Sequence, residues 1–432
     1  MKFYSTNKQS PPVSFKEATI KGQAPDKGLY FPEYIPQLDA AFIKNIETYS
    51  NEEIAYRVMA PYVGDELTEE TLRRIVNETV SFPIPLVQVS EDIASLELFH
   101  GPTLAFKDIG ARFMSRCLAA AIGTGQTSRV TVLVATSGDT GGAVANGFYG
   151  VEGVDVVILY PSGKVSPVQE KQLTTLGGNV VALEVEGTFD DCQAMVKQAF
   201  MDQELRAARF LTSANSINVA RWLPQQFYYF FAYKLWKDKE HPPVISVPSG
   251  NFGNICAGIL AMQSGLPVKH FIAACNVNDI VSDYLRTEVL TPKTAVPTLS
   301  NAMDVGNPSN FVRILEIFQH QFPALSRSLS SDTITDSETA AAIRQLLEKH
   351  NYLADPHGAV AFLALQRYLD LHPGNRGIFL ETAHPVKFPE AVEQITGSSL
   401  EIPAAVRSIM DLEKKSIVIR PDFADLKDYL LQ

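Results

Sequence analysis

The chain has 432 residues, of which 46% are hydrophobic and 20% charged, and 37 basic against 48 acidic residues leave a net charge of −11. This composition is typical of a globular protein of about three domains, and it excludes a disordered, collagen-like or small disulfide-rich chain. No block of lysine and arginine offers a footprint for nucleic acid, and no apolar run reaches the ~18 residues of a membrane helix.

Four cysteines lie far apart in the sequence, without the short spacings of zinc sites, so we expect reduced thiols and no bound metal. They are Cys117, Cys192, Cys256 and Cys275. The first ten residues, MKFYSTNKQS, lack the apolar core of a signal peptide. We therefore expect a cytoplasmic protein without nucleic-acid or membrane partners.

Residues 1–80 combine Pro- and Gly-containing turns with two helical patterns, which predict helices at 39–60 and 66–79. The segment 81–85, Ser-Phe-Pro-Ile-Pro, then interrupts the chain and indicates a domain boundary. We expect residues 1–80 to form a small N-terminal unit.

Beyond this boundary, apolar β-branched stretches alternate with helical patterns. The predicted strands are Leu96–Phe99, Val130–Thr136, Val154–Tyr160, Asn179–Val185, Val244–Val247, His270–Cys275 and Arg376–Leu380. The predicted helices are 109–123, one from about Thr140, 165–176, 188–208, 216–237, one from about Asn254, 335–350 and 357–371. Such alternation predicts an α/β fold with parallel sheets and helices on both faces. Residues 282–332 show no clear period and are predicted to form long loops.

Gly-rich turns follow three of the predicted strands, where open parallel sheets bind their ligands. They are residues 101–108, 136–142 and 249–254. In the last of these we expect Gly250 and Gly253 to take positive φ angles, so that backbone N–H groups converge on a phosphate at the start of a helix. A simple tight turn would explain any one of these loops. The P-loop and dinucleotide-binding motifs are absent, as are GxSxG and HExxH.

Lys107 narrows the choice of phosphate ligand. It stands just before a predicted helix in the apolar context Leu104-Ala105-Phe106, where the helix dipole and burial both lower the pKa of an amine. A neutral amine of this kind can form a Schiff base, whereas most single lysines are simply exposed. A Schiff-base lysine combined with a phosphate loop indicates pyridoxal 5'-phosphate (PLP).

The same residues resemble the threonine synthases. Five motifs occur in that family's order between Ser14 and about Phe388: 100–108 (HGPTLAFKD), 136–141 (TSGDTG), 213–218 (SANSIN), 248–254 (PSGNFGN) and 382–385 (TAHP). The resemblance implies PLP fold type II, as in the tryptophan synthase β-like enzymes, with two three-layer parallel-sheet lobes and a small N-terminal domain. The implied domains are 1–80 (N-terminal), 81–110 with 238–432 (large, PLP-binding) and 111–237 (small).

The resemblance also implies a set of cofactor contacts. Lys107 is expected to form the Schiff base, Asp139 to lie near the ring hydroxyl, and Thr382 to offer its hydroxyl to the pyridine nitrogen. The cofactor phosphate is expected to bind main-chain N–H groups of one loop, made of Gly250, Asn251, Phe252, Gly253 and Asn254.

The implied reaction converts O-phospho-L-homoserine and water to L-threonine and phosphate, the last step of threonine biosynthesis, with Lys107 moving protons. Two groups of residues are expected to bind the substrate. Its carboxylate is assigned to Ser137, Gly138 and Thr140, and its phosphate to Asn215, Ser216, Asn218 and Arg221. We expect a monomer or a weak homodimer.

Two other functions remain open on the sequence. Another fold type II enzyme, such as a serine/threonine dehydratase or a β-replacement synthase, would lack a second phosphate site. A non-catalytic PLP-binding scaffold would share the fold, although the intact Lys107 argues against it. Structural explanations are preferred for Asp108, as a carboxylate at a helix start, and for the aromatic run 227–231, as buried core. His100 could be a hydrogen-bonded core residue or a catalytic one. His384 is expected to shape the wall of the cofactor site, with a role in proton transfer as the alternative.

Overall fold

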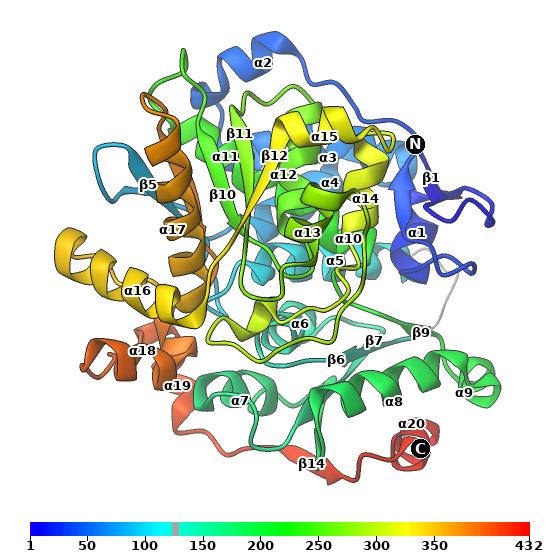
Figure 1. Ribbon diagram of the computed structural model, residues 1–432. Helices are drawn as coiled ribbons and strands as arrows, with labels where there is room; N and C mark the ends of the chain where they lie inside the picture. Colours follow the sequence, from blue (N-terminus) through cyan, green and yellow to red (C-terminus); the bar gives the residue numbers. More distant parts are fainter. Residues whose placement is uncertain (123–128) are drawn as a thin grey trace.

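The computed structural model describes residues 1–122 and 129–432, and within them the strands form three sheets. Gly123, the last residue of the predicted helix 109–123, lies outside the described residues. Figure 1 shows the smaller parallel sheet and its helices below the larger one, with the C-terminus beside the smaller sheet.

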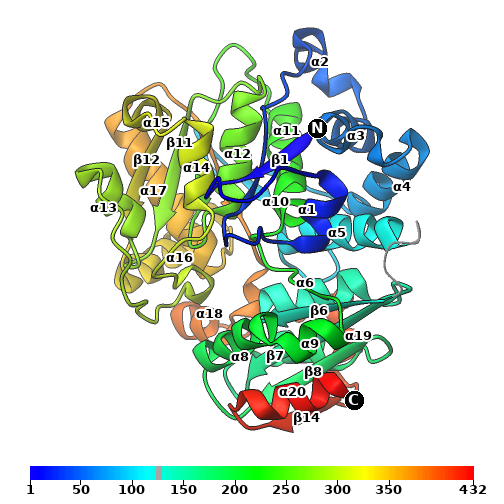
Figure 2. The same ribbon diagram turned by 90° about the vertical axis from the view of Figure 1, so that its right-hand side faces the viewer.

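The N-terminal unit joins a small antiparallel sheet to a group of helices. Its strands, in the order β2-β1-β3, are β1 (Lys2–Ser5), β2 (Val13–Ser14) and β3 (Tyr30–Pro32). Its helices are α1 (Phe15–Lys21), α2 (Ala40–Lys44), η1 (Ile46–Thr48), α3 (Asn51–Val63), η2 (Gly64–Glu66) and α4 (Glu69–Thr79). The single helix predicted at 39–60 is wrong, because the Ser50 hydroxyl accepts the Glu53 N–H and starts α3 as a new helix. Helix α1 packs against α5, as Figure 2 shows.

The larger sheet has the strand order β12-β11-β10-β13-β5-β4 and is parallel except for β4, which runs antiparallel to β5. Its strands are β4 (Leu86–Gln88), β5 (Ile93–Glu97), β10 (Val244–Pro248), β11 (His270–Cys275), β12 (Leu329–Thr333) and β13 (Gly377–Glu381). The elements around it are α11 (Gln226–Leu235), α12 (Gly253–Gln263), α13 (Ile280–Thr287), η4 (Asn301–Met303), α14 (Phe311–Ile317), α15 (Phe322–Ser328), α16 (Asp336–His350), α17 (Pro356–Leu371), η5 (Pro385–Lys387) and α18 (Pro389–Thr396). The following helix, α19 (Ala404–Met410), packs on α7 (Pro167–Thr174) near the smaller sheet.

Alternation along β11 shows that both faces of this sheet are covered. Phe271 and Ala273 belong to the core that includes α12, whereas Ile272 and Ala274 belong to a separate core with α16 and α17. Successive side chains of a strand point to opposite faces, so helices lie on both sides. The predicted fold class, α/β with parallel sheets, is therefore confirmed at the level of this sheet.

The smaller sheet has the order β14-β8-β7-β6-β9, and its four neighbouring strand pairs are parallel. Its strands are β6 (Val130–Ala135), β7 (Val154–Pro161), β8 (Val180–Val185), β9 (Leu211–Thr212) and β14 (Ser416–Ile419). The helices that pack on it or on its covering helices are α5 (Lys107–Ile122), α6 (Asp139–Phe148), α7 (Pro167–Thr174), α8 (Phe189–Met201), α9 (Gln203–Ala208) and α20 (Phe423–Leu431). The short elements α10 (Val219–Trp222) and η3 (Leu223–Gln225) pack against α5 and α12 instead.

The end of the chain belongs to this smaller sheet. Strand β14 pairs with β8, where Ile417 lies opposite Leu183, and α20 packs on α8. The assignment of all of 238–432 to the large domain is therefore wrong for residues 416–431, because that segment completes the edge of the other sheet. The remaining domain boundaries stay predictions.

Three further sequence expectations need correction. The helix predicted at 188–208 divides where Asp202 accepts the Leu205 N–H and caps α9. The helix predicted at 216–237 divides into α10, η3 and α11, with Pro224 inside η3. The region 282–332 holds α14, α15 and β12 in addition to loops. Strand β12, with the sequence LSSDT, was missed because an edge strand needs no apolar alternation.

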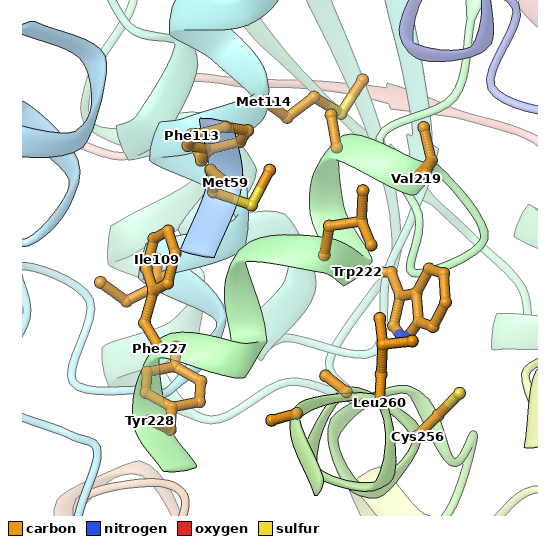
Figure 3. Close-up of a cluster of buried hydrophobic side chains, with 14 of the residues drawn as sticks. Met59, Ile109, Phe113, Met114, Val219, Trp222, Phe227, Tyr228, Cys256 and Leu260 are labelled. Carbon is orange, nitrogen blue, oxygen red and sulfur yellow. The ribbon is translucent and has the colours of Figure 1, made fainter. Parts of the chain in front are cut away.

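One continuous core joins the N-terminal unit to both sheets. Figure 3 shows Met59 of α3 facing Ile109 and Phe113 of α5, with Phe227 of α11 nearby and Trp222 of α10 close to α12. The aromatic run 227–231 is buried there, as predicted. Within residues 1–122 and 129–432, no helix is both long and apolar enough to cross a bilayer.

Candidate active site

Three loops meet at one edge of the larger sheet. They follow β10, β13 and β5, which are neighbours in the strand order and run parallel, so their carboxyl ends lie together. The loop after β13 pairs directly with the loop after β5: Phe106 N–H donates to Thr382 O at 2.8 Å, and His384 N–H donates to Leu104 O at 3.0 Å. The sheet thereby places Thr382 beside the Lys107 segment.

Lys107 is the first residue of α5, and the loop before it is held firmly. Leu104 takes a positive φ of 58°, which turns the chain into the helix. Asp108 lies in the first turn of α5, as expected for a carboxylate at a helix start, and it also holds the preceding loop: its carboxylate accepts the Thr103 N–H at 3.0 Å and the Thr103 hydroxyl at 2.6 Å. Burial raises the pKa of Asp108 to about 6. From the aromatic run, the Tyr228 hydroxyl donates to Phe106 O.

The Lys107 amine is an unusual base. Its pKa is lowered to about 8, mainly by burial. The charges of Lys387 and Arg221 act in the same direction, whereas the negative charge of Asp139 acts against them. The sequence predicted this direction from burial and the helix dipole. At neutral pH a useful fraction of the amine is therefore uncharged and nucleophilic.

The loop 249–252 after β10 differs from its predicted geometry. The positive φ angle of this turn belongs to Phe252, at 61°, and not to Gly250 or Gly253. The glycines are required for space instead: a Cβ on Gly250 would lie 2.6 Å from the Met303 Cα, and one on Gly253 would lie 3.3 Å from the Asn310 Nδ2. The loop leads straight into α12, whose first N–H groups are free to bind an anion.

Asn254, in the first turn of α12, gives an independent sign of a missing ligand. Its Oδ1 accepts the Tyr229 hydroxyl at 2.8 Å, which turns its Nδ2 the other way. That Nδ2 is buried and has no partner among the described residues. An orphaned buried donor in a loop of converging N–H groups fits the phosphate of PLP.

Asp139 begins α6 and its carboxylate is buried beside a second lysine. Lys387 Nζ lies 2.8 Å from Asp139 Oδ1, and Gln169 Nε2 donates to the same oxygen at 3.0 Å. Burial by itself would raise the pKa of Asp139, but the charges of Lys387 and Lys107 outweigh it and hold that pKa well below the usual range. Asp139 is thus a fixed anion close to Lys107.

The turn that precedes α6 is built for a close approach to a ligand. Gly138 has a φ of 138°, and a Cβ there would lie 2.4 Å from the Gln169 Cδ. The Thr136 hydroxyl oxygen accepts the N–H groups of Gly138 at 3.0 Å and Gly141 at 2.8 Å. Ser137 is exposed and Thr140 is half-buried, so both remain accessible at this edge.

In the segment expected to bind the substrate phosphate, one residue contacts the loop after β10 and another is turned into the fold. Ser216 lies beside the loop 249–252, where the Asn251 Nδ2 donates to the Ser216 hydroxyl at 2.6 Å, and its chain neighbour Asn215 is half-buried. Asn218 is turned away: its Nδ2 donates to Thr19 O at 2.9 Å and its Oδ1 caps α10. The Asn218 amide therefore serves the fold, and its expected contact with substrate does not fit.

Arg221 is buried, and its Nη1 donates to Ala214 O. Its Nε is buried without a partner among the described residues. Arg221 lies close enough to Lys107 to lower the pKa of that amine, so it remains a candidate for binding an anion at the site.

The two histidines expected near the site have structural contacts. His100 Nε2 lies 2.6 Å from Glu97 Oε2. Burial lowers the pKa of His384 to about 4, so its ring is neutral at physiological pH, and its Nδ1 accepts the Val386 N–H at 3.2 Å. His384 also packs edge-on against Phe99, 5.2 Å between ring centroids.

Comparison with known proteins agrees with this arrangement. Residues 87–380 match the family of pyridoxal-phosphate dependent enzymes, residues 2–80 match the threonine synthase N terminus, and residues 358–430 match the threonine synthase C-terminal family. Threonine synthases from Haemophilus influenzae and Escherichia coli are 47% and 45% identical to the chain, over 100% of it and at least 99% of their own lengths.

The chain belongs to the threonine synthase family.

Solved structures of threonine synthases have the same fold. The Escherichia coli structure has a TM-score of 0.92 at 44% identity, and the PLP-bound structure from Brucella melitensis has one of 0.93 at 36%; each covers 100% of this chain and is itself 99% covered. A threonine deaminase from Solanum lycopersicum, 14% identical over 78% of the chain with a TM-score of 0.56, shares only the fold. The predicted family, fold type and PLP cofactor are confirmed, and the substrate class is a small molecule.

Sequence reasoning missed several residues of this threonine synthase site. Lys387 stands two residues after the TAHP motif, and its buried ammonium could have been suspected only from its apolar neighbours Val386 and Phe388. Tyr228 and Tyr229 were assigned to the core, which is correct for their rings, but their hydroxyls hold the lysine loop and Asn254. No local pattern distinguishes those hydroxyls from the other aromatic residues of the run.

Proposed function

We propose that this threonine synthase family member converts O-phospho-L-homoserine and water to L-threonine and phosphate. The observation that carries the proposal is the Lys107 amine, with its pKa lowered to about 8, at the meeting point of donor-rich loops. One anion site lies after β10 and a second polar turn lies before α6, which suits a substrate that has both a phosphate and a carboxylate.

Lys107 has two tasks in this proposal. It would hold PLP covalently through its amine, and after substrate takes that place it would carry protons between the substrate Cα and Cβ. When bound, PLP supplies an aldehyde for the substrate amine and a conjugated ring that accepts electron density. A pKa near 8 suits an amine that must both accept and donate a proton near neutral pH.

Thr382 and Asp139 would define the chemistry around the ring. Thr382 is buried and follows β13, where it can offer a neutral hydroxyl to the pyridine nitrogen. A neutral partner makes a weaker electron sink than a carboxylate would, which favours elimination and replacement over transamination. Asp139, fixed as an anion by Lys387, would face the ring hydroxyl.

The main-chain N–H groups of the loop that contains Gly250, Asn251, Phe252, Gly253 and Asn254 would hold the cofactor phosphate. Ser137, Gly138 and Thr140 would bind the substrate carboxylate at the start of α6. The buried Arg221, with its unpartnered Nε, and the neighbouring Ser216 and Asn215 would receive the substrate phosphate before it leaves.

The proposal extends to a cytoplasmic enzyme that is a monomer or a weak homodimer, an expectation that rests on the sequence. Light scattering at several protein concentrations tests the second part, and a single stable higher oligomer would contradict it.

The function is tested by incubating the holoenzyme with O-phospho-L-homoserine and measuring L-threonine and inorganic phosphate, which should form in equal amounts. O-Phosphoserine and free serine serve as matched substrates, and both should react far more slowly. Comparable dehydration of serine would instead support the dehydratase alternative. PLP binding with no turnover of any of the three would support a non-catalytic scaffold.

A further inference from the structure

Arg313 of α14 is a buried cation that contacts no carboxylate among the described residues. Its side chain is 0% exposed, and its guanidinium donates to Tyr30 O at 3.2 and 3.0 Å, to Ile217 O at 2.7 Å and to Asn310 Oδ1 at 2.7 Å. It also lies 4.4 Å from the ring centroid of Trp222. Each of these acceptors is a neutral group. A buried charge without an opposite charge is costly, which indicates a use for it.

The charge persists at neutral pH. Burial lowers the pKa of Arg313 to about 9, so the guanidinium is still protonated at pH 7. Because arginine has donors and no acceptor, the contact fixes the orientation of the Asn310 amide with its Oδ1 toward Arg313. The Asn310 Nδ2 then faces the Ser216 hydroxyl, at 3.4 Å, and the Asn310 N–H donates to Asn251 O at 3.2 Å.

A second amide is oriented in the same way. The Ser309 N–H, which can only donate, donates to Asn251 Oδ1 at 2.6 Å. The Asn251 Nδ2 therefore faces Ser216 as a donor, at 2.6 Å. The Ser216 oxygen thus accepts from two amides, which occupies both of its lone pairs. Its own proton must be donated elsewhere, since within the described part of the chain both groups in contact with it are amide donors.

Ser216 lies at the phosphate loop. A Cβ on Gly253 would lie 3.8 Å from the Ser216 Cβ and 3.3 Å from the Asn310 Nδ2. The hydroxyl is half-buried and remains accessible to a ligand beside that loop. An anion there would accept the proton that the two amides force outward.

We propose that Arg313, acting through Asn310, makes Ser216 an obligatory hydrogen-bond donor to a phosphate monoester bound beside the loop of Gly250 to Asn254. Arg313 is a positioning residue, since it does not itself reach that loop. The inference rests on the proposed function, in which both the cofactor and the substrate are phosphate monoesters. It also explains how a protein of net charge −11 holds such an anion: a buried cation polarises a short relay toward it.

The first test compares PLP with pyridoxal, which lacks the phosphate. Apoenzyme with Ser216→Ala is titrated with each, and the variant should bind PLP about 10-fold or more weakly, as expected for a lost bond to a charged group, while its affinity for pyridoxal is unchanged. Ser213→Ala, in the same segment, is the matched control and should bind both normally. If PLP affinity is unchanged and the KM for O-phosphohomoserine rises about 10-fold at equal kcat, the substrate supplies the phosphate and the proposal also stands.

Asn310→Asp tests the relay with almost no change of shape. Its carboxylate would accept from both Arg313 and Ser216, so the Ser216 proton would turn away from the ligand. The loss of phosphate affinity should match that of Ser216→Ala, and the double variant should lose no more than either single variant. Arg313→Met, which preserves side-chain volume, should likewise cause no further loss of phosphate affinity when it is combined with Ser216→Ala. Thermal unfolding checks that each variant is folded.

Two results would overturn the relay. One is an equal loss of PLP and pyridoxal affinity in Ser216→Ala, which would mean a general structural role. The other is normal affinity for both phosphate ligands in Ser216→Ala and Asn310→Asp. The binding comparison needs no turnover, so it is separate from the function test: a wild-type enzyme that fails to convert O-phosphohomoserine refutes the function and leaves the relay to be judged by PLP against pyridoxal.

Discussion

Lys387 places its ammonium 2.8 Å from the carboxylate of Asp139, and both side chains are buried. The same ammonium donates to Thr103 O at 2.8 Å and to Gln172 Oε1 at 3.0 Å. Lys387 follows a strand of the larger sheet, whereas Asp139 and Gln172 belong to helices of the smaller one. The ion pair therefore joins the two lobes at the site, next to the loop that leads to Lys107.

Lys387→Met should destabilise the protein strongly. It leaves the Asp139 charge buried without its partner, which costs about 3–5 kcal/mol for pairs of this kind. The double variant Lys387→Met with Asp139→Asn should recover part of that loss, because the uncompensated charge is removed. Denaturant unfolding of the wild type, the single variant and the double variant measures the free energy of unfolding.

Lys414→Met is the control for this prediction. Its ammonium lies 2.7 Å from carboxylates of both Glu170 and Glu184, but the side chain is 35% exposed. Glu184 is buried, but it keeps hydrogen bonds from the Ser162 and Ser416 hydroxyls when Lys414 is removed, so this variant should lose less stability than Lys387→Met. Equal losses at the two lysines would show that burial does not determine the importance of Lys387.

The pH dependence of cofactor uptake should report the Lys107 amine. Because its pKa is about 8, the neutral fraction rises with pH, reaches one half near pH 8 and levels off above it. The rate at which apoenzyme forms the covalent PLP complex, followed by absorbance, should do the same. Asp139→Asn should move the inflection to lower pH, since Asp139 raises this pKa, and Lys387→Met should move it to higher pH. An inflection near 10.4, the ordinary lysine value, would contradict the burial of the amine.

Borohydride reduction of the holoenzyme should attach a pyridoxyl group to Lys107. Peptide mapping by mass spectrometry identifies the modified residue, and Lys107→Ala should show neither modification nor turnover. Lys387 is the informative alternative, because it is the other buried lysine beside Asp139. Its amine is held in an ion pair and should remain unmodified; a pyridoxyl group on Lys387 would refute the assignment of Lys107.

Gly250→Ala should weaken PLP binding and lower stability by about 1–3 kcal/mol, the usual cost of overpacking. Its Cβ would lie 2.6 Å from the Met303 Cα, and backbone cannot move aside as a side chain can. Gly142→Ala inside α6 is the matched change: its nearest contact is the Gln172 Oε1 at 3.2 Å, and alanine favours a helix by about 0.5–1 kcal/mol. PLP titration and thermal unfolding measure both, and normal PLP affinity in Gly250→Ala would show that the loop can shift.

The alternation of apolar strands with helices determined the α/β class, because side-chain period reports the faces that a segment must bury. The ends of helices were mispredicted where one capping side chain starts a new helix, as Ser50 and Asp202 do. The edge strands β12 and β14 escaped prediction, since an edge strand need not be apolar on both faces. The pairing of β14 with β8 joins residues more than two hundred positions apart, and nothing in their local sequence specifies it.

Residue type and order identify the class of chemistry at this site, because Lys107, the Gly-rich loop and Thr382 are recognisable in the chain. The charge and orientation of these groups depend on contacts between distant segments. Lys387 reaches Asp139, and Arg313 reaches Asn310 beside Ser216, through folding of segments that are far apart in the chain. The reason is physical: a local pattern encodes which face of an element is buried, whereas the partner of a buried charge depends on which distant elements the sheets bring together.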